Sequence, residues 1–247
     1  MMYSFLLIGQ SNMAGRGFPN EVEKIPNAGI YVQRNGRWWP MYVPVNPDRV
    51  TAGINLAESF AYRFHQDHPE DTVGLITCAD GGTRLDQWMP GESIYDHAVM
   101  QAKLAMRTST ICGILWHQGE SDCAEDRYPF YEEKCTYIMN SLRKELGLED
   151  VPLLLGGLGS WLEFCPRDEK FKNYPHVNRA LEAMASKLPN CAFVSAEGLG
   201  CNPDYLHFSA AGLREFGHRY YEKYLELAPE LTDGKEADLT VTEIEKL

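Results

Sequence analysis

The chain has 247 residues, a length within the range of one α/β domain, and no apolar stretch approaches the roughly 20 residues that a membrane-spanning helix needs. Its formal net charge of −12 argues against nucleic acid or an anionic membrane as partner, because both attract Lys and Arg. The start of the chain lacks the basic region of a secretory signal, and its seven cysteines include no Cys-x-x-Cys pair. We therefore expect reduced thiols and a cytoplasmic location.

Apolar, β-branched runs alternate with helical patterns along most of the chain. The predicted elements are, in chain order, strands at 3–8, 30–33 and 37–39, a helix at 54–65, a strand at 72–77, a helix at 93–107, a strand at 111–116, a helix at about 128–146, a strand at 151–155, a helix at 174–188, a strand at 191–196 and a helix at 210–227. Asn35-Gly36 predicts a hairpin turn between its two strands, and Ser209 is a candidate N-cap of the last helix.

Strands that alternate with helices indicate βαβ units and a mainly parallel sheet. We expect a single catalytic domain over residues 1–228. Residues 229–247 are acidic and poorly periodic, and we expect them to form a tail or a short surface element.

Four short polar clusters follow apolar runs or precede a helical pattern. They are Gly-Gln-Ser-Asn-Met-Ala-Gly at 9–15, Gly-Gly-Thr at 81–83, His-Gln-Gly-Glu-Ser at 117–121 and Asp-Tyr-Leu-His at 204–207. Ligands of open α/β sheets bind outside the carboxyl ends of the strands, so these clusters are expected to converge there. Together they supply a serine, a histidine, acids and oxyanion donors, which are the parts of a serine hydrolase.

Ser11 comes directly after the first predicted strand. A serine there is commonly a helix N-cap, but the same position gives a nucleophile free backbone N–H groups and the helix dipole. His207 is the candidate general base, with Asp204 three residues earlier in position to orient it if the segment turns. The alternative for 202–204 is an ordinary surface turn, because Asn-Pro-Asp is a turn-forming string.

The other two clusters offer oxyanion donors. Gly81 or Gly82 could present a backbone N–H, although a plain loop explains the pair equally well. Gln118 follows a strongly apolar strand, and its side-chain amide could donate to an oxyanion. Glu120 could serve as a second acid beside His207.

Several other site types lack support in the sequence. Only one strand precedes Ser11 and the serine is not in Gly-x-Ser-x-Gly, which excludes the usual α/β-hydrolase layout. No His/Cys/carboxylate group has zinc spacing, and there is no Gly-x-Gly-x-x-Gly or Walker pattern. We expect neither a metal nor a cofactor.

The four clusters, taken in order, resemble the sequence blocks of the SGNH (GDSL-type) hydrolase superfamily. The closer resemblance, with Trp-His-Gln-Gly-Glu-Ser-Asp at 116–122 as the third block, is to the sialate O-acetylesterase-like branch, which includes the acetyl xylan esterases of carbohydrate esterase family six. It spans residues 3 to about 224. The resemblance implies a flavodoxin-like three-layer α/β/α sandwich with a mainly parallel sheet, and no metal.

The resemblance also implies roles. Ser11 would be the nucleophile and His207 the base, and the backbone N–H groups of Ser11 and of a glycine at 81–82 would form part of the oxyanion hole. Most SGNH enzymes carry Asn in the third block, whereas this chain has Gln118, as the carbohydrate esterase branch does. For the acid, we prefer Asp204, which fits Asp-x-x-His; Glu120 has also been given that role in this branch.

The expected activity is removal of O-acetyl groups from a small carbohydrate, either an acetylated xylo-oligosaccharide or a sialate-type sugar, by two-step acyl transfer. Candidate sugar contacts are Gln10, Asn12, Arg84, Trp88 and Trp161. Two alternatives remain: an enzyme of the same fold acting on a lipid, thioester or other acyl substrate, and a non-catalytic carbohydrate-binding module. The sequence does not determine the oligomeric state.

Overall fold

A seven-stranded sheet forms the centre of the protein. The structure is a computed structural model that describes residues 1–228 and residue 231. The strands are β1 (Met2–Gly9), β2 (Ile30–Arg34), β3 (Arg37–Pro40), β4 (Thr72–Thr77), β5 (Thr110–His117), β6 (Leu153–Gly156) and β7 (Cys191–Val194). They lie in the order β3-β2-β4-β1-β5-β6-β7, and every neighbouring pair is parallel except β2 and β3.

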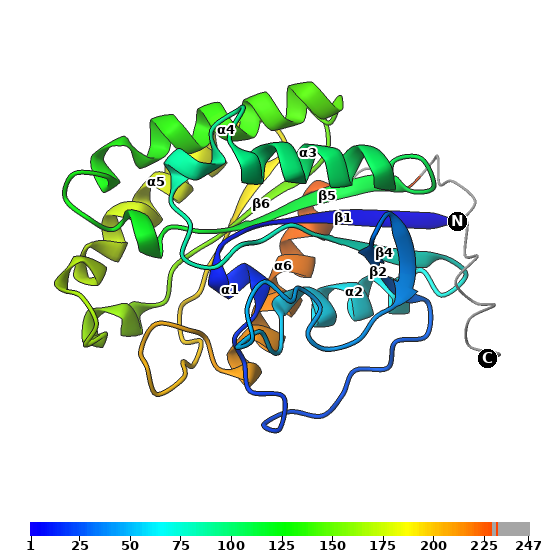
Figure 1. The fold of residues 1–247 in the computed structure, drawn as a ribbon, viewed down its shortest axis with the longest axis horizontal. Coiled ribbons are helices and arrows are strands. Elements are labelled where there is room, and N and C mark those ends of the chain that lie inside the picture. The colour runs from blue at the N-terminus through cyan, green and yellow to red at the C-terminus, as the bar shows by residue number, and fades with distance from the viewer. Residues whose placement is uncertain (229–230, 232–247) are drawn as a thin grey trace.

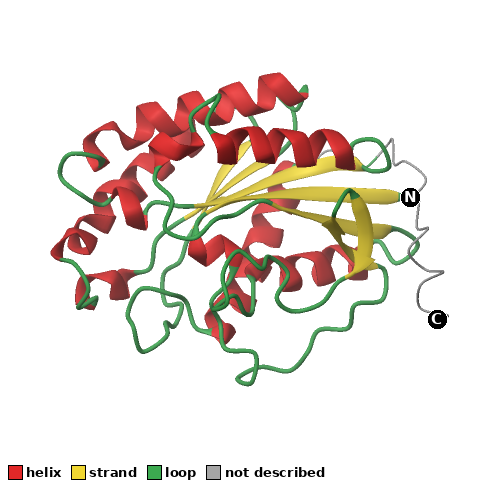
Figure 2. Cartoon of the chain, viewed as in Figure 1, coloured by secondary structure: helices red, strands yellow, loops and turns green. Residues whose placement is uncertain are grey.

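Helices cover both faces of this sheet (Figures 1 and 2). The helices are α1 (Ser11–Ala14), α2 (Leu56–Asp67), α3 (Ser93–Ala105), α4 (Tyr131–Leu146), α5 (Tyr174–Lys187) and α6 (Ala210–Leu227). Helices α2 and α6 pack against each other on one face, while α3, α4 and α5 lie on the other. The predicted three-layer α/β/α fold with a mainly parallel sheet is confirmed.

Strand β1 lies in the middle of the sheet, and all eight of its residues are buried. A strand covered on both faces needs apolar side chains on both, so its sequence shows a continuous apolar run rather than an alternation. On the face covered by α2 and α6, Phe5 meets Phe60 and Phe64 edge to face, with ring centroids 4.7 and 5.1 Å apart. This packing fixes β1, and with it the polar turn that follows.

The local signals read from the sequence are confirmed at two turns. Asn35 and Gly36 both have positive φ, 50° and 72°, as a type I′ hairpin between β2 and β3 requires. The Ser209 side chain accepts a hydrogen bond from the Gly212 N–H at 3.1 Å and so caps α6.

Two predicted helix starts differ from the structure for local reasons. Helix α2 begins at Leu56 rather than at 54, because the Asn55 side chain caps it and Glu58 returns a bond to the Asn55 N–H at 2.8 Å. The predicted start at about 128 is a separate 3₁₀ turn, Tyr128–Phe130, and α4 follows it. The proposed tail at 229–247 lies outside the described residues, apart from residue 231.

None of the helices in the described part of the chain is long and apolar enough to cross a membrane. All seven cysteines lie in that part and are free thiols, and six of them are buried.

Candidate active site

Ser11 is the first residue of α1, immediately beyond the carboxyl end of β1. The turn needs Gly9, whose φ is 137° and where a Cβ would collide with the backbone carbonyl of His117 on β5. The Gln10 N–H donates to that carbonyl at 2.9 Å. Ser11 thus lies at the carboxyl end of the central strands, on a turn that is hydrogen-bonded to the neighbouring strand β5.

His207 is held by a compact loop between β7 and α6. Asp204 organises this loop, because its Oδ1 accepts the backbone N–H groups of Leu206 at 3.0 Å and His207 at 3.1 Å. The His207 carbonyl accepts the Asn202 N–H at 2.8 Å, which closes the loop on itself. The Asn-Pro-Asp string therefore does form a turn, and this turn places the histidine.

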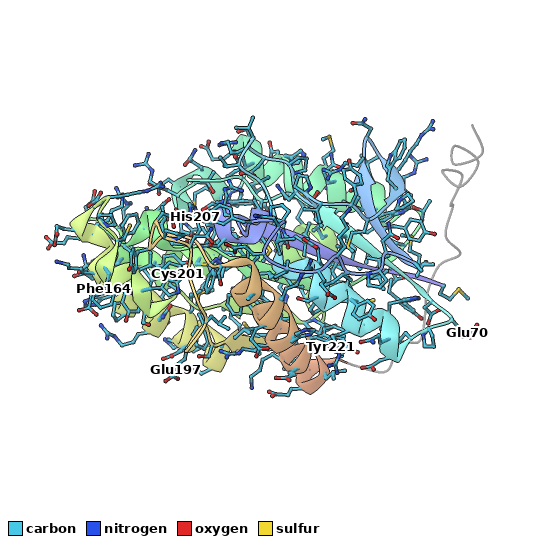
Figure 3. All side chains as sticks on the ribbon, turned by 90° about the horizontal axis from the view of Figure 1, so that it is seen from below. Glu70, Phe164, Glu197, Cys201, His207 and Tyr221 are labelled. Carbon is cyan, nitrogen blue, oxygen red and sulfur yellow. The ribbon has the colours of Figure 1, made fainter. Side chains whose placement is uncertain are left out.

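Ser11, His207 and Asp204 come together although Ser11 and His207 lie 196 positions apart in the chain. His207 Nε2 lies 3.1 Å from Ser11 Oγ, and His207 Nδ1 lies 2.7 Å from Asp204 Oδ2. Figure 3 shows His207 in the half of the molecule away from Glu70, near Cys201. Both distances are within hydrogen-bond range, and the order of contacts is that of a Ser-His-Asp triad.

Asp204 is suited to remain ionised. Partial burial acts to raise its pKa, but hydrogen bonds from the Leu206 N–H and from His207 outweigh this, so the pKa of Asp204 lies below its ordinary value. An exposed Arg167 side chain also reaches Asp204 Oδ2 at 3.3 Å. A charged Asp204 would keep the proton of His207 on Nδ1 and leave Nε2 free to accept one from Ser11.

Asn12, a predicted sugar contact, is fully buried. Its Nδ2 donates to the Leu206 carbonyl at 3.2 Å and its Oδ1 accepts the Phe208 N–H at 3.1 Å. These bonds bracket His207 in the chain. The residue next to the serine therefore holds the histidine loop, and it has no surface left for a sugar.

Glu120 lies on the other side of Asn12, whose Nδ2 also donates to Glu120 Oε1. Glu120 is 1% exposed and makes no hydrogen bond with His207. Its Oε1 lies 3.8 Å from Nδ1 of His117, and its Oε2 has no hydrogen-bond partner among the described residues. Burial lowers the pKa of His117, although the nearby Glu120 opposes this. Of the two candidate acids, only Asp204 hydrogen-bonds to the candidate base.

Gln118 differs from the expectation for an oxyanion donor. Its Nε2 donates to the Thr83 carbonyl at 3.1 Å and to Asp122 Oδ2 at 2.5 Å. The backbone of Gln118 is held as well, because its carbonyl accepts Tyr131 Oη at 2.7 Å. The Gln118 amide N–H groups are thus bound to Asp122 and Thr83. Gln118 instead connects the end of β5 to the segment after Gly82.

The Gly81–Gly82 segment does lie beside Ser11. A Cβ placed on Gly81 would be 3.6 Å from the Ser11 Cβ. The Gly81 N–H, however, donates to Asp48 Oδ2 at 2.8 Å. Gly82 has a φ of 80° and lines the same cavity as Ser11.

Most of the other predicted sugar contacts lie away from this cavity. Trp88 is buried, donates to Thr83 Oγ1 at 3.1 Å and packs in the core. Trp161 is also buried and donates to the Leu199 carbonyl at 3.2 Å, so neither ring offers a free face for stacking. Arg84 is exposed but is not part of the cavity wall. Gln10 does line the cavity, and its Oε1 accepts the backbone N–H groups of residues 119 and 121.

The cavity lined by Ser11 and His207 has a volume of about 410 Å³. Its wall consists of Gln10, Ser11, Arg16, Arg49, Gly81, Gly82, Glu120, Ser121, Arg167, Asp168, Lys170, Phe171, Leu206 and His207. Its four cationic side chains were not among the predicted site residues, and they come from segments between the predicted strands and helices. Cavities of similar size elsewhere contain no member of the triad. Within residues 1–228 and 231, no cluster of three His, Cys, Asp or Glu side chains could hold a metal ion.

Comparison with known proteins supports an esterase assignment. A family model described as "Carbohydrate esterase, sialic acid-specific acetylesterase" matches residues 2–226. A probable carbohydrate esterase of Arabidopsis thaliana is 27% identical over 244 residues, which cover 90% of this chain and 89% of the relative. The crystal structure of the same Arabidopsis protein has a TM-score of 0.80 at 25% identity and covers 91% of this chain and 98% of that one.

Two further solved structures share the fold at lower sequence identity. NanS has a TM-score of 0.70 at 18% identity, with 91% of this chain and 97% of NanS covered. A carbohydrate acetylesterase from Xanthomonas citri has a TM-score of 0.64 at 16% identity, with 92% of this chain and 56% of the Xanthomonas chain covered.

Proposed function

The chain belongs to the family of carbohydrate esterases described as sialic acid-specific acetylesterases, and on this premise we propose that it is a serine esterase that removes O-acetyl groups from carbohydrates. The observation that supports the proposal most directly is the line of contacts from Ser11 Oγ through His207 to Asp204, 3.1 and 2.7 Å long. It opens onto a cavity large enough for a small ligand.

The proposed reaction has two acyl-transfer steps. His207 Nε2 takes the proton of Ser11 Oγ as this oxygen attacks the acetyl carbonyl, and the same proton goes to the sugar oxygen as it leaves. Water, activated by His207, then cleaves the acetyl-serine ester and releases acetate. Asp204, whose low pKa keeps it charged, stabilises the imidazolium that forms in each step.

We assign the oxyanion to two backbone donors. The Ser11 N–H opens the first turn of a helix, where an N–H has no acceptor within the helix. Gly82 is the second, because Gly81, the alternative, already donates its N–H to Asp48. Gln118 is left out of the oxyanion hole because its amide is bound elsewhere.

The cavity wall favours a short acyl group on a polar substrate. Phe171 and Leu206 are the only large apolar side chains among the wall residues of the described cavity, so a long lipid chain would find little apolar surface. The wall instead offers carboxylates, amides and cations that can hydrogen-bond to sugar hydroxyls.

Among acetylated sugars, we place a sialate-type substrate first and an acetylated xylo-oligosaccharide second. Arg49 and Arg167 line the cavity with side chains that are 51% and 57% exposed. Their acidic partners are Asp80 at 2.7 Å and Asp204 at 3.3 Å, and exposed pairs of this kind contribute at most about 1 kcal/mol. A substrate carboxylate can therefore take over such a cation, whereas a neutral xylo-oligosaccharide gains nothing from it.

The test is acetate release from O-acetylated N-acetylneuraminic acid, acetylated xylo-oligosaccharides and the 4-nitrophenyl esters of acetate and octanoate. Ser11→Ala runs beside the wild type and is expected to lower turnover by roughly 10³-fold or more. Ser93→Ala is a matched control, because Ser93 also opens a helix but is exposed and outside the cavity.

Each outcome decides between the alternatives. Release from a sugar that is abolished only in Ser11→Ala supports the proposal and identifies the sugar. Turnover of octanoate without release from any sugar would move the assignment to a lipase or thioesterase. No turnover by the folded wild type would favour a carbohydrate-binding module.

We also propose a cytoplasmic location. Buried free thiols at six positions are compatible with a reducing compartment. Fractionation of cells that produce the protein, followed by immunodetection, tests this, and recovery from the extracellular medium would contradict it.

A further inference from the structure

A buried ion pair lies beside the nucleophile and has no part in the reaction proposed above. The side chains of Arg16 and Asp48 are 7% and 4% exposed. Arg16 Nη1 donates to Asp48 Oδ1 at 2.9 Å and Nη2 donates to Oδ2 at 2.7 Å, so the pair is joined by two parallel hydrogen bonds. Arg16 Nη1 also donates to the Gly15 carbonyl at 2.9 Å.

The pair connects the turn after Ser11 to the segment after β4. Asp48 Oδ2, the oxygen that binds Arg16, also accepts the Gly81 N–H at 2.8 Å. Arg16 lies in the segment just after α1, the helix that begins at Ser11. Gly81 is followed by the proposed donor Gly82. Asp48 therefore links the chain that follows Ser11 to the segment that carries Gly82.

The space around Gly81 is filled by the same groups. A Cβ on Gly81 would lie 2.6 Å from Arg16 Nη2, 2.8 Å from Asp48 Oδ2 and 3.6 Å from the Ser11 Cβ. The φ of Gly81 is not in the left-handed region, so the close contacts, rather than the backbone conformation, exclude a side chain there. The ion pair thus packs directly against the glycine that faces the serine.

A buried ion pair is a costly way to stabilise a fold, because both charges lose their water. A bidentate pair does, however, fix geometry, and oxyanion stabilisation depends on donors that are in place before the charge develops. Arg16 also lines the cavity that contains Ser11 and His207.

We propose that Arg16 and Asp48 are positioning residues that hold the Gly81–Gly82 backbone against Ser11, so that the tetrahedral intermediate meets its N–H donors without rearrangement. The inference rests on the proposed serine esterase function. It concerns the transition state and not the sugar, and it can therefore be tested with an ester that carries no sugar.

The test measures kcat and KM for 4-nitrophenyl acetate, with active sites counted by titration with a phosphonate that reacts with Ser11. Asp48→Asn keeps the shape of the side chain but loses the charge. We expect kcat per active site to fall by about 10- to 100-fold, as for a displaced or lost oxyanion donor, with KM within about 2-fold of wild type. Arg16→Lys keeps the charge but cannot form two parallel hydrogen bonds with Asp48. Its kcat per active site is therefore expected to fall as well.

A second readout separates positioning from a loss of stability. Methylboronic acid forms a tetrahedral, negatively charged adduct with a serine nucleophile and so resembles the intermediate of acetyl transfer. Its affinity is expected to fall in Asp48→Asn by the same factor as kcat. Gly81→Ala, which leaves both charges in place but pushes into the pair, is expected to lower both quantities as well.

Glu58→Gln is the matched control, because Glu58 and Arg214 form another buried pair, 2.8 Å apart, between α2 and α6. This variant is expected to lose stability while kcat per active site stays within about 2-fold of wild type. The proposal is overturned if Asp48→Asn keeps its kcat, or if its loss of kcat is matched by Glu58→Gln or is absent from boronate binding. If the wild type hydrolyses 4-nitrophenyl acetate but releases acetate from no sugar, only the carbohydrate assignment fails.

Discussion

Two carboxylates lie near Ser11 in very different surroundings. The Asp204 side chain is 26% exposed, accepts two backbone N–H groups and contacts His207 at 2.7 Å. The Glu120 side chain is 2% exposed, binds Asn12, and has one oxygen without a partner among the described residues. An acid that stabilises an imidazolium must touch it, whereas a buried acid behind the serine can act only through what it holds. Sequence position alone allowed both roles, and the contacts separate them.

The two carboxylates are therefore expected to have different roles. Asp204 orients the histidine ring, and Glu120 with Asn12 holds the loop on which that ring sits. Substitution of Asp204 should therefore affect turnover most, and substitution of Asn12 or Glu120 less.

Asp204→Asn is expected to lower kcat per active site by roughly 10³- to 10⁴-fold, because the amide cannot stabilise the imidazolium and permits the wrong tautomer. The measurement is acetate release with active sites titrated by a phosphonate. Asp86→Asn, at an exposed carboxylate paired with Lys134, is the control and should leave kcat unchanged. A loss below about 10-fold in Asp204→Asn would remove Asp204 from the triad, since a loss that small is no larger than one ordinary hydrogen bond accounts for.

Asn12→Ala is expected to lower kcat by about 10- to 100-fold, because the His207 loop loses its two hydrogen bonds to Asn12 and the ring moves relative to Ser11. The free energy of unfolding should fall by about 1–3 kcal/mol as buried groups lose their partners. Kinetics and urea unfolding measure the two effects. Asn178→Ala removes a similar pair of side-chain bonds, at Leu158, and should change only the stability. Equal kcat in both variants would contradict a positioning role for Asn12.

Glu120→Gln is expected to lower kcat by less than about 10-fold, because the amide oxygen can still accept from Asn12 and a single hydrogen bond contributes only about 1 kcal/mol. The same titrated assay measures it. A loss as large as that of Asp204→Asn would reverse the roles of the two acids.

The smallest effect is expected on stability and depends on pH. Burial lowers the pKa of His117 in the folded state. Below about pH 6.5, His117 is therefore protonated in the unfolded chain at pH values where it stays neutral in the folded chain. Stability is then lost as the pH falls through that value, by at most about 1.4 kcal/mol per pH unit for this residue. Urea unfolding at pH 7.5, 6.5 and 5.5 should show the free-energy advantage of wild type over His117→Gln shrinking with acidity. A difference that does not change with pH would contradict this.

Much of the fold could be predicted because its signals are local. Alternating strand and helix patterns, Asn35-Gly36 and Ser209 each depend on neighbours in the sequence. The structure has each of these elements, although some ends are shifted, as at the starts of α2 and α4. The convergence of residues 11 and 207 at one sheet edge follows from the topology in the same way.

Side-chain partners from distant segments could not be predicted. Sequence patterns did not indicate that Asp122 would bind the Gln118 amide, that Asp48 would take the Gly81 N–H, or that Trp88 would be buried. The loop at 40–50 carries no periodic signal, yet it provides Asp48 and Arg49 beside the cavity. Such contacts depend on packing between segments that are far apart in the chain.

The most direct test of the account is the proton NMR signal of the His207 Nδ1–H. A proton in a 2.7 Å hydrogen bond to a charged carboxylate resonates far downfield, so such a signal is expected in wild type and in Glu120→Gln. The signal is expected to be lost in His207→Gln and in Asp204→Asn. A signal that persists in Asp204→Asn but disappears in Glu120→Gln would show that Glu120 is the acid, and would contradict the arrangement described here.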